Sequence, residues 1–232
     1  MRFRLDDAVE FPASPAFVVD TQRATVLGSG EYRVSTVEHL LSALAGTGIT
    51  NAVIAVDGPE IPAEDGSAAS FVAAIDAAGI VEQPQTRRVV TVSEPRVFHD
   101  GDKTLVVLPA PSFRVRMTIE FPAPVGAQHF AYDAAATSYR DEVATNRTFG
   151  FRREVEALLA RGLAMGGSLE NAVVFDDDGP LVPLRHANEP VRHKVLDLIG
   201  DFALLGAEPQ FEVIAYKSGH TLHAGAVREL AG

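Results

Sequence analysis

Apolar residues recur along this chain with two different periods, and the alternation of those periods predicts an α+β protein. Within Val34–Ala45 they repeat every three to four residues, so we expect a helix there that Ser35 or Thr36 can cap. Short β-branched runs bounded by Gly and Pro predict strands. Strands are expected at Asn51–Val56, Arg88–Val97, Thr104–Leu108, Phe113–Phe121 and Phe211–Tyr216, and further helices at Ser67–Ala78 and Phe151–Ala160.

The arrangement of these segments predicts a chain in two parts. The mostly polar segment Val81–Arg88 is the best linker candidate, which gives domains at residues 1–84 and 85–232. A strand-and-turn sequence that begins at Asn51 is echoed 120 residues later at Asn171. So short a match can arise by chance, but the shared order of elements favours two similar halves. The segment Pro122–Tyr139 is predicted to be an irregular insertion within the second half.

Composition narrows the function classes. The 232 residues are 47% hydrophobic, enough for a substantial core, and 31 acidic against 20 basic residues give a net charge of −11. That balance argues against a protein that binds nucleic acid through a basic surface. The chain has no cysteine, so any metal must be held by His, Asp, Glu or water. The charged N-terminus is not a secretion signal, and a cytoplasmic protein is expected.

Three histidines stand in settings that suggest chemistry. His193 and Asp197 lie at i and i+4 of an apolar helix, on one face, a spacing that suits two ligands of one metal. Such a pair is more often a surface pair, but a buried charge needs a partner or a metal. Glu38 and His39 point roughly 100° apart on a helix, so one could bind metal while the other reaches water. The structural alternative is a helix-start glutamate beside a hydrogen-bonded histidine.

The remaining candidates lie near segment ends. His220 follows an apolar strand on a glycine-bearing loop, where it could line a cleft, and His223 is close by. Thr148 could cap the helix that follows it or donate to an oxyanion. The run Gly166-Gly167-Ser168 could approach a ligand closely but lacks the spacing of a phosphate-binding loop.

Taken together, the motifs resemble those of the UDP-3-O-acyl-N-acetylglucosamine deacetylase family, zinc amidases of lipid A synthesis. They occur in family order and spread over most of the chain. The matching stretches are Ser35-Thr-Val-Glu-His-Leu-Leu-Ser-Ala-Leu-Ala-Gly46, Asp57-Gly-Pro-Glu-Ile-Pro62, Asp65-Gly-Ser-Ala-Ala69, Arg147-Thr-Phe-Gly-Phe151, Gly166-Gly-Ser-Leu-Glu-Asn-Ala172, Val191-Arg-His-Lys-Val-Leu-Asp-Leu-Ile-Gly-Asp201 and Lys217-Ser-Gly-His220.

The resemblance implies a fold and a metal site. The fold would be two similar two-layer α/β sandwich domains, with helices packed between outward-facing sheets. Zinc would be held by His39, His193 and Asp197, and the fourth position would be left for water. Iron(II) also fits such nitrogen and oxygen donors. We expect a monomer that acts on an acylated UDP-sugar and has at most peripheral contact with a membrane.

The resemblance also implies a role for each further site residue. Glu38 would take a proton from water on the zinc, and Thr148 would stabilise the oxyanion. His220, oriented by Asp201, would donate to the departing amine. Substrate contacts would come from Lys194, Phe149, Phe121 and Gly167, and an apolar passage for the acyl chain is expected within Ala164–Arg185.

The chain departs from the family pattern at three places. It starts after the strands that carry a Gly-Leu-His-Thr-Gly-like motif, so either the first sheet is reduced or the start of the chain is truncated. Phe121-Pro122-Ala123 replaces a phenylalanine followed by Asn-His, and Thr221-Leu222-His223 replaces Ala-Leu-Asn. These differences leave two alternatives open. One is a non-catalytic homologue that binds a nucleotide sugar or acyl chain, and the other is a deacetylase of a different N-acetyl sugar.

Overall fold

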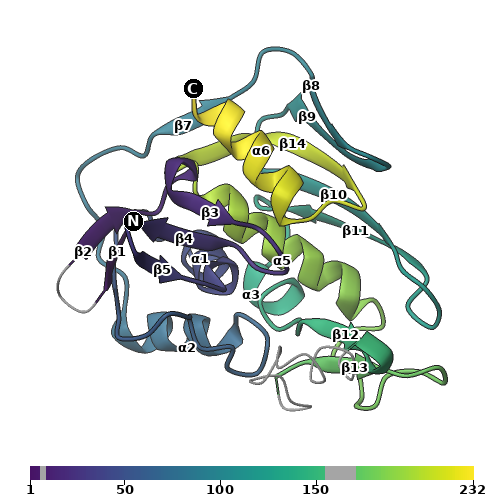
Figure 1. Ribbon diagram of the computed structural model, residues 1–232. Helices are drawn as coiled ribbons and strands as arrows, with labels where there is room; N and C mark the ends of the chain where they lie inside the picture. Colours follow the sequence, from purple (N-terminus) through teal and green to yellow (C-terminus); the bar gives the residue numbers. More distant parts are fainter. Residues whose placement is uncertain (6–8, 155–170) are drawn as a thin grey trace.

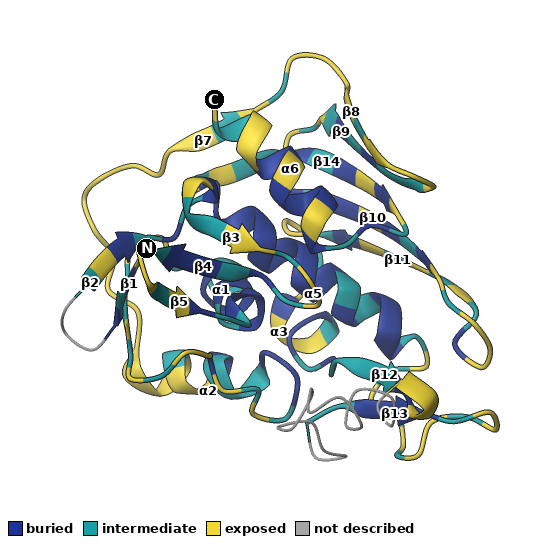
Figure 2. Cartoon of the chain, in the orientation of Figure 1, coloured by how far each residue is buried: buried dark blue, intermediate teal, exposed yellow. Residues whose placement is uncertain are grey.

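Helix α1 (Val37–Gly46) crosses helix α5 (Glu189–Ala203) near the middle of the molecule, and the sheets lie outside this pair (Figure 1). A computed structural model describes residues 1–5, 9–154 and 171–232. The helices are packed between sheets whose outer faces are exposed, as expected for the α+β class. Figure 2 shows α5 buried along nearly its whole length, so this helix forms the centre of the core.

The N-terminal part of the chain consists of small sheets and helices. Its elements are β1 (Arg2–Leu5), β2 (Val9–Pro12), η1 (Pro15–Phe17), β3 (Val18–Asp20), β4 (Val26–Ser29), β5 (Tyr32–Val34), α1, β6 (Val53–Val56) and α2 (Ala69–Ala78). One sheet has the order β2-β1-β6, with β6 parallel to β1, and another has the antiparallel order β3-β4-β5. Helix α1 lies between β5 and β6 in the chain and packs in the interior of the molecule.

The C-terminal part contains the large sheet. Its elements are β7 (Val89–Thr91), β8 (Arg96–Asp100), β9 (Lys103–Pro109), β10 (Arg114–Glu120), β11 (Ala127–Asp133), α3 (Tyr139–Glu142), β12 (Phe149–Phe151), β13 (Val173–Phe175), α5, β14 (Glu208–Tyr216) and α6 (His220–Ala231). The sheet runs in the order β11-β10-β14-β9-β8, and β7 also pairs with β14. Burial alternates along β9, β10 and β14, because one face packs on α5 and α6 while the other faces outward.

Several expected elements are confirmed with small shifts. Helix α2 and strand β6 lie within the expected ranges, and α1 begins three residues later and ends one residue later than expected. Residues 81–88 are exposed and without regular structure. Thr36 precedes α1, but its hydroxyl donates to Glu60 Oε1 at 2.7 Å instead of capping the helix. Its backbone has φ 58°, a left-handed conformation. The hydroxyl therefore ties the start of α1 to the neighbouring loop.

Other expectations were wrong. The strand expected over Arg88–Val97 is broken into β7 and β8 around Pro95, which has no N–H for a ladder. Pro122–Tyr139 is not irregular throughout, because β11 pairs with β10 along its whole length. Strand β11 is an edge strand with mostly exposed or half-buried residues, so its apolar alternation is weak.

The segment around Phe151 also differs from expectation. Phe149–Phe151 is a strand, helical backbone follows at residues 152–154, and the rest of the expected helix lies outside the described residues. Strand β12 pairs in parallel with β13, the strand of the second echo. The first echo, β6, also has a parallel partner in β1, but the two pairs belong to sheets of different size. Both echo strands thus have a parallel partner, in sheets of three and two strands.

Candidate active site

Helix α1 brings two neighbouring candidate site residues to its crossing with α5. Glu38 and His39 are 3% and 5% exposed. The crossing is close because Gly200 of α5 lies under the Glu38 carbonyl: a Cβ at Gly200 would lie 2.0 Å from that oxygen. Only glycine, which has no Cβ, lets the α1 backbone come this close to α5. The close approach places α1 over the face of α5 that carries His193 and Asp197.

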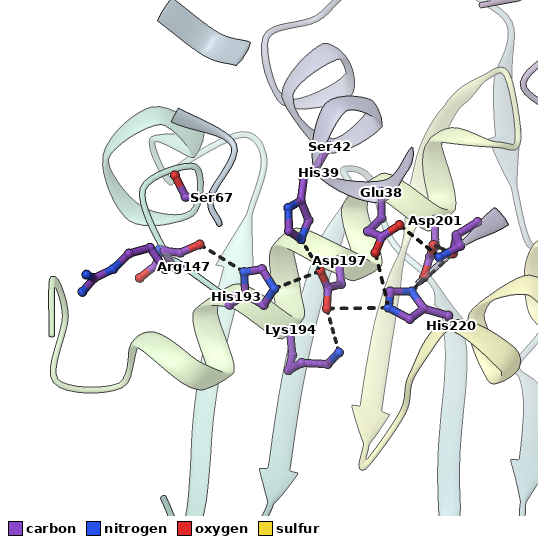
Figure 3. A network of polar contacts seen from close by, with 12 residues as sticks. Glu38, His39, Ser42, Ser67, Arg147, His193, Lys194, Asp197, Asp201 and His220 are labelled. Carbon is purple, nitrogen blue, oxygen red and sulfur yellow. Dashed lines mark hydrogen bonds and ion pairs between the residues drawn. The ribbon is translucent and has the colours of Figure 1, made fainter. Parts of the chain in front are cut away.

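His39, His193 and Asp197 converge in a buried cluster (Figure 3). Asp197 Oδ1 lies 3.5 Å from His39 Nε2 and 3.2 Å from His193 Nε2, and the two imidazole rings meet edge to face with centroids 5.0 Å apart. The Asn146 carbonyl lies 3.1 Å from His193 Nδ1, so that nitrogen carries the proton and Nε2 keeps its lone pair. Burial lowers the pKa of His193 to about 4, which keeps the ring neutral.

The donor set fits a metal ion. Among the described residues, Asp197 Oδ1 and His39 Nδ1 are buried without a hydrogen-bond partner. A buried carboxylate oxygen without a donor is costly, and a cation bound between it and the imidazole nitrogens would remove that cost. Burial would raise the pKa of Asp197, but His193 and Lys194 hold it well below its usual value, so the carboxylate is available as a ligand.

Glu38 points away from this cluster toward His220 (Figure 3). Its Oε2 accepts the backbone N–H of Thr25 at 3.0 Å, and its Oε1 lies 3.8 Å from His220 Nε2. Burial raises the pKa of Glu38. The side chains of Glu38 and His39 thus point to different groups, Glu38 to His220 and His39 to Asp197, because successive residues of a helix point in different directions.

His220 is the first residue of α6, not a loop residue as expected. Its Nδ1–H donates to Asp201 Oδ2 at 2.8 Å, and its Nε2 lies 4.0 Å from Asp197 Oδ2. Burial would lower the pKa of His220, but Asp201 raises it to about 9. The ring can therefore hold a proton beside Glu38 at neutral pH.

Of the remaining expected residues, Lys194 contacts this centre directly. Lys194 Nζ donates to Asp197 Oδ2 at 2.6 Å. Thr148 precedes β12, and its backbone is fixed by hydrogen bonds of 2.8 Å to Gly66 and Val173. Phe121 and Phe149 form an edge-to-face pair with centroids 5.1 Å apart. Gly167 lies outside the described residues.

An aromatic cluster accompanies the parallel strand pair. Phe149, Phe151 and Phe175 of β12 and β13 pack near one another, with Phe121 against the first two. A cavity of about 360 Å³ opens beside Phe151 and Phe175, and most of its other lining residues are charged: Arg152, Arg153, Asp176, Asp177 and Asp178. Leu169, expected in the apolar passage, lies outside the described residues, whereas Val173 and Phe175 are buried.

Sequence reasoning assigned no role to some residues of this network. Thr25 Oγ1 donates to Asp201 Oδ1 at 2.5 Å, and His223 Nδ1 lies 2.7 Å from Asp201 Oδ2. The spacing of Thr25 in the sequence gives no indication of a role. The role of His223 could have been predicted, because it lies one helical turn after His220. Asp201, His220 and His223 also form a candidate metal-binding group, but hydrogen bonds already join these atoms.

The fold and the site define a class: an α+β protein with a candidate metal centre of two histidines and one aspartate, flanked by a glutamate and a histidine–aspartate pair. The model of the UDP-3-O-acyl N-acetylglycosamine deacetylase family matches residues 1–232, so the chain belongs to this family and the expected resemblance is confirmed.

Individual relatives agree with the family match. The UDP-3-O-acyl-N-acetylglucosamine deacetylase of Acidithiobacillus ferrooxidans is 50% identical over 94% of this chain and 73% of its own length. The enzymes of that name from Anaeromyxobacter sp. and Syntrophotalea carbinolica are 48% and 45% identical, over 98% and 96% of this chain and 76% and 73% of their own lengths. None of the described helices has the length and apolarity needed to cross a membrane.

Proposed function

We propose that this protein hydrolyses the acetamide of a UDP-3-O-(3-hydroxyacyl)-N-acetylglucosamine, with release of acetate, as a zinc-dependent step of lipid A synthesis. The observation that carries the proposal is the meeting of Glu38, His220 and the His39–His193–Asp197 cluster at one helix crossing. Family membership supplies the substrate class, since the relatives are named for this deacetylation.

His39, His193 and Asp197 would hold the zinc ion, and a centre with three protein ligands keeps a position open. Bound zinc would acidify a water molecule and polarise the acetamide carbonyl. Iron(II) is compatible with the same donors.

Glu38 is proposed as the general base. Its Oε1 side faces the space between α1 and α6, and its burial raises its pKa toward the range in which a carboxylate accepts a proton effectively. In the reaction it would take the proton of the water that attacks the carbonyl carbon. Thr148 is proposed to donate its hydroxyl to the oxyanion that forms there.

His220 is proposed as the general acid. As the C–N bond breaks, His220 would give a proton to the amine nitrogen, which leaves as the free amine of the sugar while the acyl fragment leaves as acetate. Asp201 stabilises the charged imidazole before this transfer. Glu38 and His220 lie on opposite sides of a short gap, so one can accept and the other donate a proton.

Substrate contacts are proposed for Lys194, Phe121, Phe149 and Gly167. Lys194 would contact the polar head group when its ammonium leaves Asp197, and Phe121 and Phe149 would pack near the sugar. Gly167 is proposed as a further contact. The aromatic cluster on β12 and β13 would line the acyl passage, because its rings pack together as apolar surface.

The organisation of the whole chain is proposed as two domains, 1–84 and 85–232, with their boundary in the exposed segment 81–88. The two parts contribute different ligands, His39 from the first and His193 and Asp197 from the second. Because one chain supplies every proposed ligand, a monomer would suffice for activity.

Metal content measured together with acetate release from the acylated UDP-sugar tests the proposal. One zinc per chain is expected, and activity should disappear on chelation and return with zinc. Bound zinc without turnover would point to a binding protein or to a different N-acetyl sugar. Protein without metal that still releases acetate would contradict the proposal.

Two substitutions test the proton-transfer roles. Glu38→Ala and His220→Ala should each lower kcat by about 10²- to 10⁴-fold while zinc content is kept. Glu31→Ala, at an exposed turn position, is the control and should keep full activity. Near-normal turnover in both site variants would rule out the proposed mechanism.

A further inference from the structure

Asp201, which is expected to orient His220, has further hydrogen-bond partners besides that histidine. Oδ2 of this carboxylate is 2.8 Å from His220 Nδ1 and 2.7 Å from His223 Nδ1, while Oδ1 accepts Thr25 Oγ1 at 2.5 Å. Asp201 and His223 are 1% and 0% exposed. Both histidines belong to the first turn of α6, so one carboxylate of α5 fixes that turn at two points.

The hydrogen-bond partners define the state of the His223 ring. A carboxylate only accepts, so Nδ1 of His223 carries a proton. Its Nε2 lies 2.8 Å from Ser218 Oγ, and burial lowers the pKa of His223 despite the neighbouring Asp201. Ser218 therefore donates to Nε2. The Ser218 hydroxyl has one proton, and Met117 Sδ, 3.7 Å away, is the weaker acceptor.

His223 acts at a distance from the reacting groups. Among the described contacts, its ring meets Asp201, Ser218, Phe202 and the edge of His220, with centroids 6.3 Å from Phe202 and 6.2 Å from His220. The chain of contacts is thus Ser218 to His223, His223 to Asp201, and Asp201 to His220. The hydrogen-bonded route from His223 to His220 therefore passes through the Asp201 carboxylate.

We propose that His223, with its ring set by Ser218, is a positioning residue that fixes the Asp201 carboxylate and thereby the direction in which His220 presents Nε2 to the substrate. The proposal rests on the proposed function, in which His220 transfers a proton. Without His223, Oδ2 would keep His220 as its one partner and Oδ1 would keep Thr25. The carboxylate could then rotate about the Thr25 contact, and His220 would rotate with it. A small misplacement of a proton donor is enough to slow a reaction substantially.

Matched variants separate this role from simple packing. His223→Leu keeps the volume but removes the donor, and kcat should fall roughly 10- to 100-fold with KM and zinc content unchanged. His223→Asn places an amide N–H₂ where Nδ1–H stood and should restore most of kcat. Val227→Ala removes buried volume from the same helix and should lower stability without lowering kcat.

A spectroscopic measurement tests the positioning without relying on activity. In zinc-loaded protein labelled with ¹⁵N-histidine, the hydrogen-bonded Nδ1–H signal of His220 should be sharp in the wild type and in His223→Asn, and broadened in His223→Leu. If His223→Leu does not fold, Ser218→Ala serves instead, because it leaves the ring in place and removes only the hydroxyl that sets it.

The outcomes are distinguishable. An unchanged His220 signal in His223→Leu, or equal losses of kcat in His223→Leu and His223→Asn, would overturn the positioning role. An inactive wild type with the expected signals would contradict the proposed function and leave the positioning of His220 supported.

Discussion

At the scale of single residues, the buried carboxylates differ in how completely they are hydrogen-bonded. Asp201 accepts from three side chains, and Glu189, fully buried, accepts from Arg147 and Arg185. Asp197 keeps one buried oxygen without a donor. Since a buried charge is stable only when paired, the incomplete pairing of Asp197 marks it as the carboxylate arranged for a ligand from outside the chain.

Glu189 provides a test of a buried carboxylate whose oxygens are both hydrogen-bonded. Glu189 Oε1 accepts Arg147 Nε at 2.8 Å, and its Oε2 accepts the Arg185 backbone N–H at 2.7 Å. Burial would raise the pKa of Glu189, but these donors lower it. Glu189→Gln should lower the free energy of unfolding by about 2 kcal/mol near pH 7, because a charge-assisted pair is lost.

The pH dependence has a definite sign. The folded pKa of Glu189 lies below the unfolded one, so its stabilisation is complete above the unfolded pKa of about 4.3 and is lost as pH falls through the folded pKa. The difference in the free energy of unfolding between wild type and Glu189→Gln, measured in urea, should therefore shrink as pH falls below about 4.3. Glu31→Gln is the exposed control, and a difference that stays constant with pH would contradict the assignment.

At the scale of elements, the position of α1 against α5 decides whether a site exists. His39 and Glu38 come from one helix, and His193, Asp197 and Asp201 from the other. The two backbones meet where Gly200 faces the Glu38 carbonyl. A change of about 1 Å at this crossing would separate the ligand atoms, because interiors are close-packed and transmit such a shift.

Gly200→Ala should therefore damage both stability and the site. The added Cβ would overlap the Glu38 carbonyl oxygen, at a cost of about 3 kcal/mol in the free energy of unfolding. Zinc affinity should fall as well. Gly225→Ala on α6 is the matched control: nothing lies within 4 Å of its Cβ, and alanine should stabilise that helix by about 0.5–1 kcal/mol. Equal changes in the free energy of unfolding for the two variants, measured in urea, would contradict the claim that the α1–α5 crossing requires glycine at position 200.

At the scale of the whole molecule, a bound metal would connect the N-terminal and C-terminal parts of the chain. Ligand binding to the folded state alone stabilises it by about 2.7 kcal/mol at a free concentration 100-fold above Kd. For a chain of this length that corresponds to a rise in Tm of roughly 5–10 °C.

Chelation of the zinc-loaded protein should lower Tm by that amount, and added zinc should restore it. Asp197→Asn should abolish the shift, because the proposed carboxylate ligand is lost, whereas Asp100→Asn, at the exposed end of β8, should keep it. A chelator that leaves the wild-type Tm unchanged, or an equal shift in Asp197→Asn, would show that no metal joins α1 and α5.

The local pattern of the sequence already determined many elements and the candidate ligands. Apolar periodicity located α1, and the i, i+4 spacing placed His193 and Asp197 on one face of α5. Motif resemblance supplied the family and proposed His39 as the third ligand. These features could be read because they depend on neighbours within one or two helical turns.

The tertiary structure alone decided which distant groups share a hydrogen bond. Thr25 contacts Asp201 across 176 residues, and the edge strand β11 is defined by its pairing with β10 rather than by its own pattern. The sequence named His223 without showing that its partner is Asp201. Such contacts follow from how α1, α5 and α6 pack, and packing depends on the shapes of surfaces that are far apart in the chain.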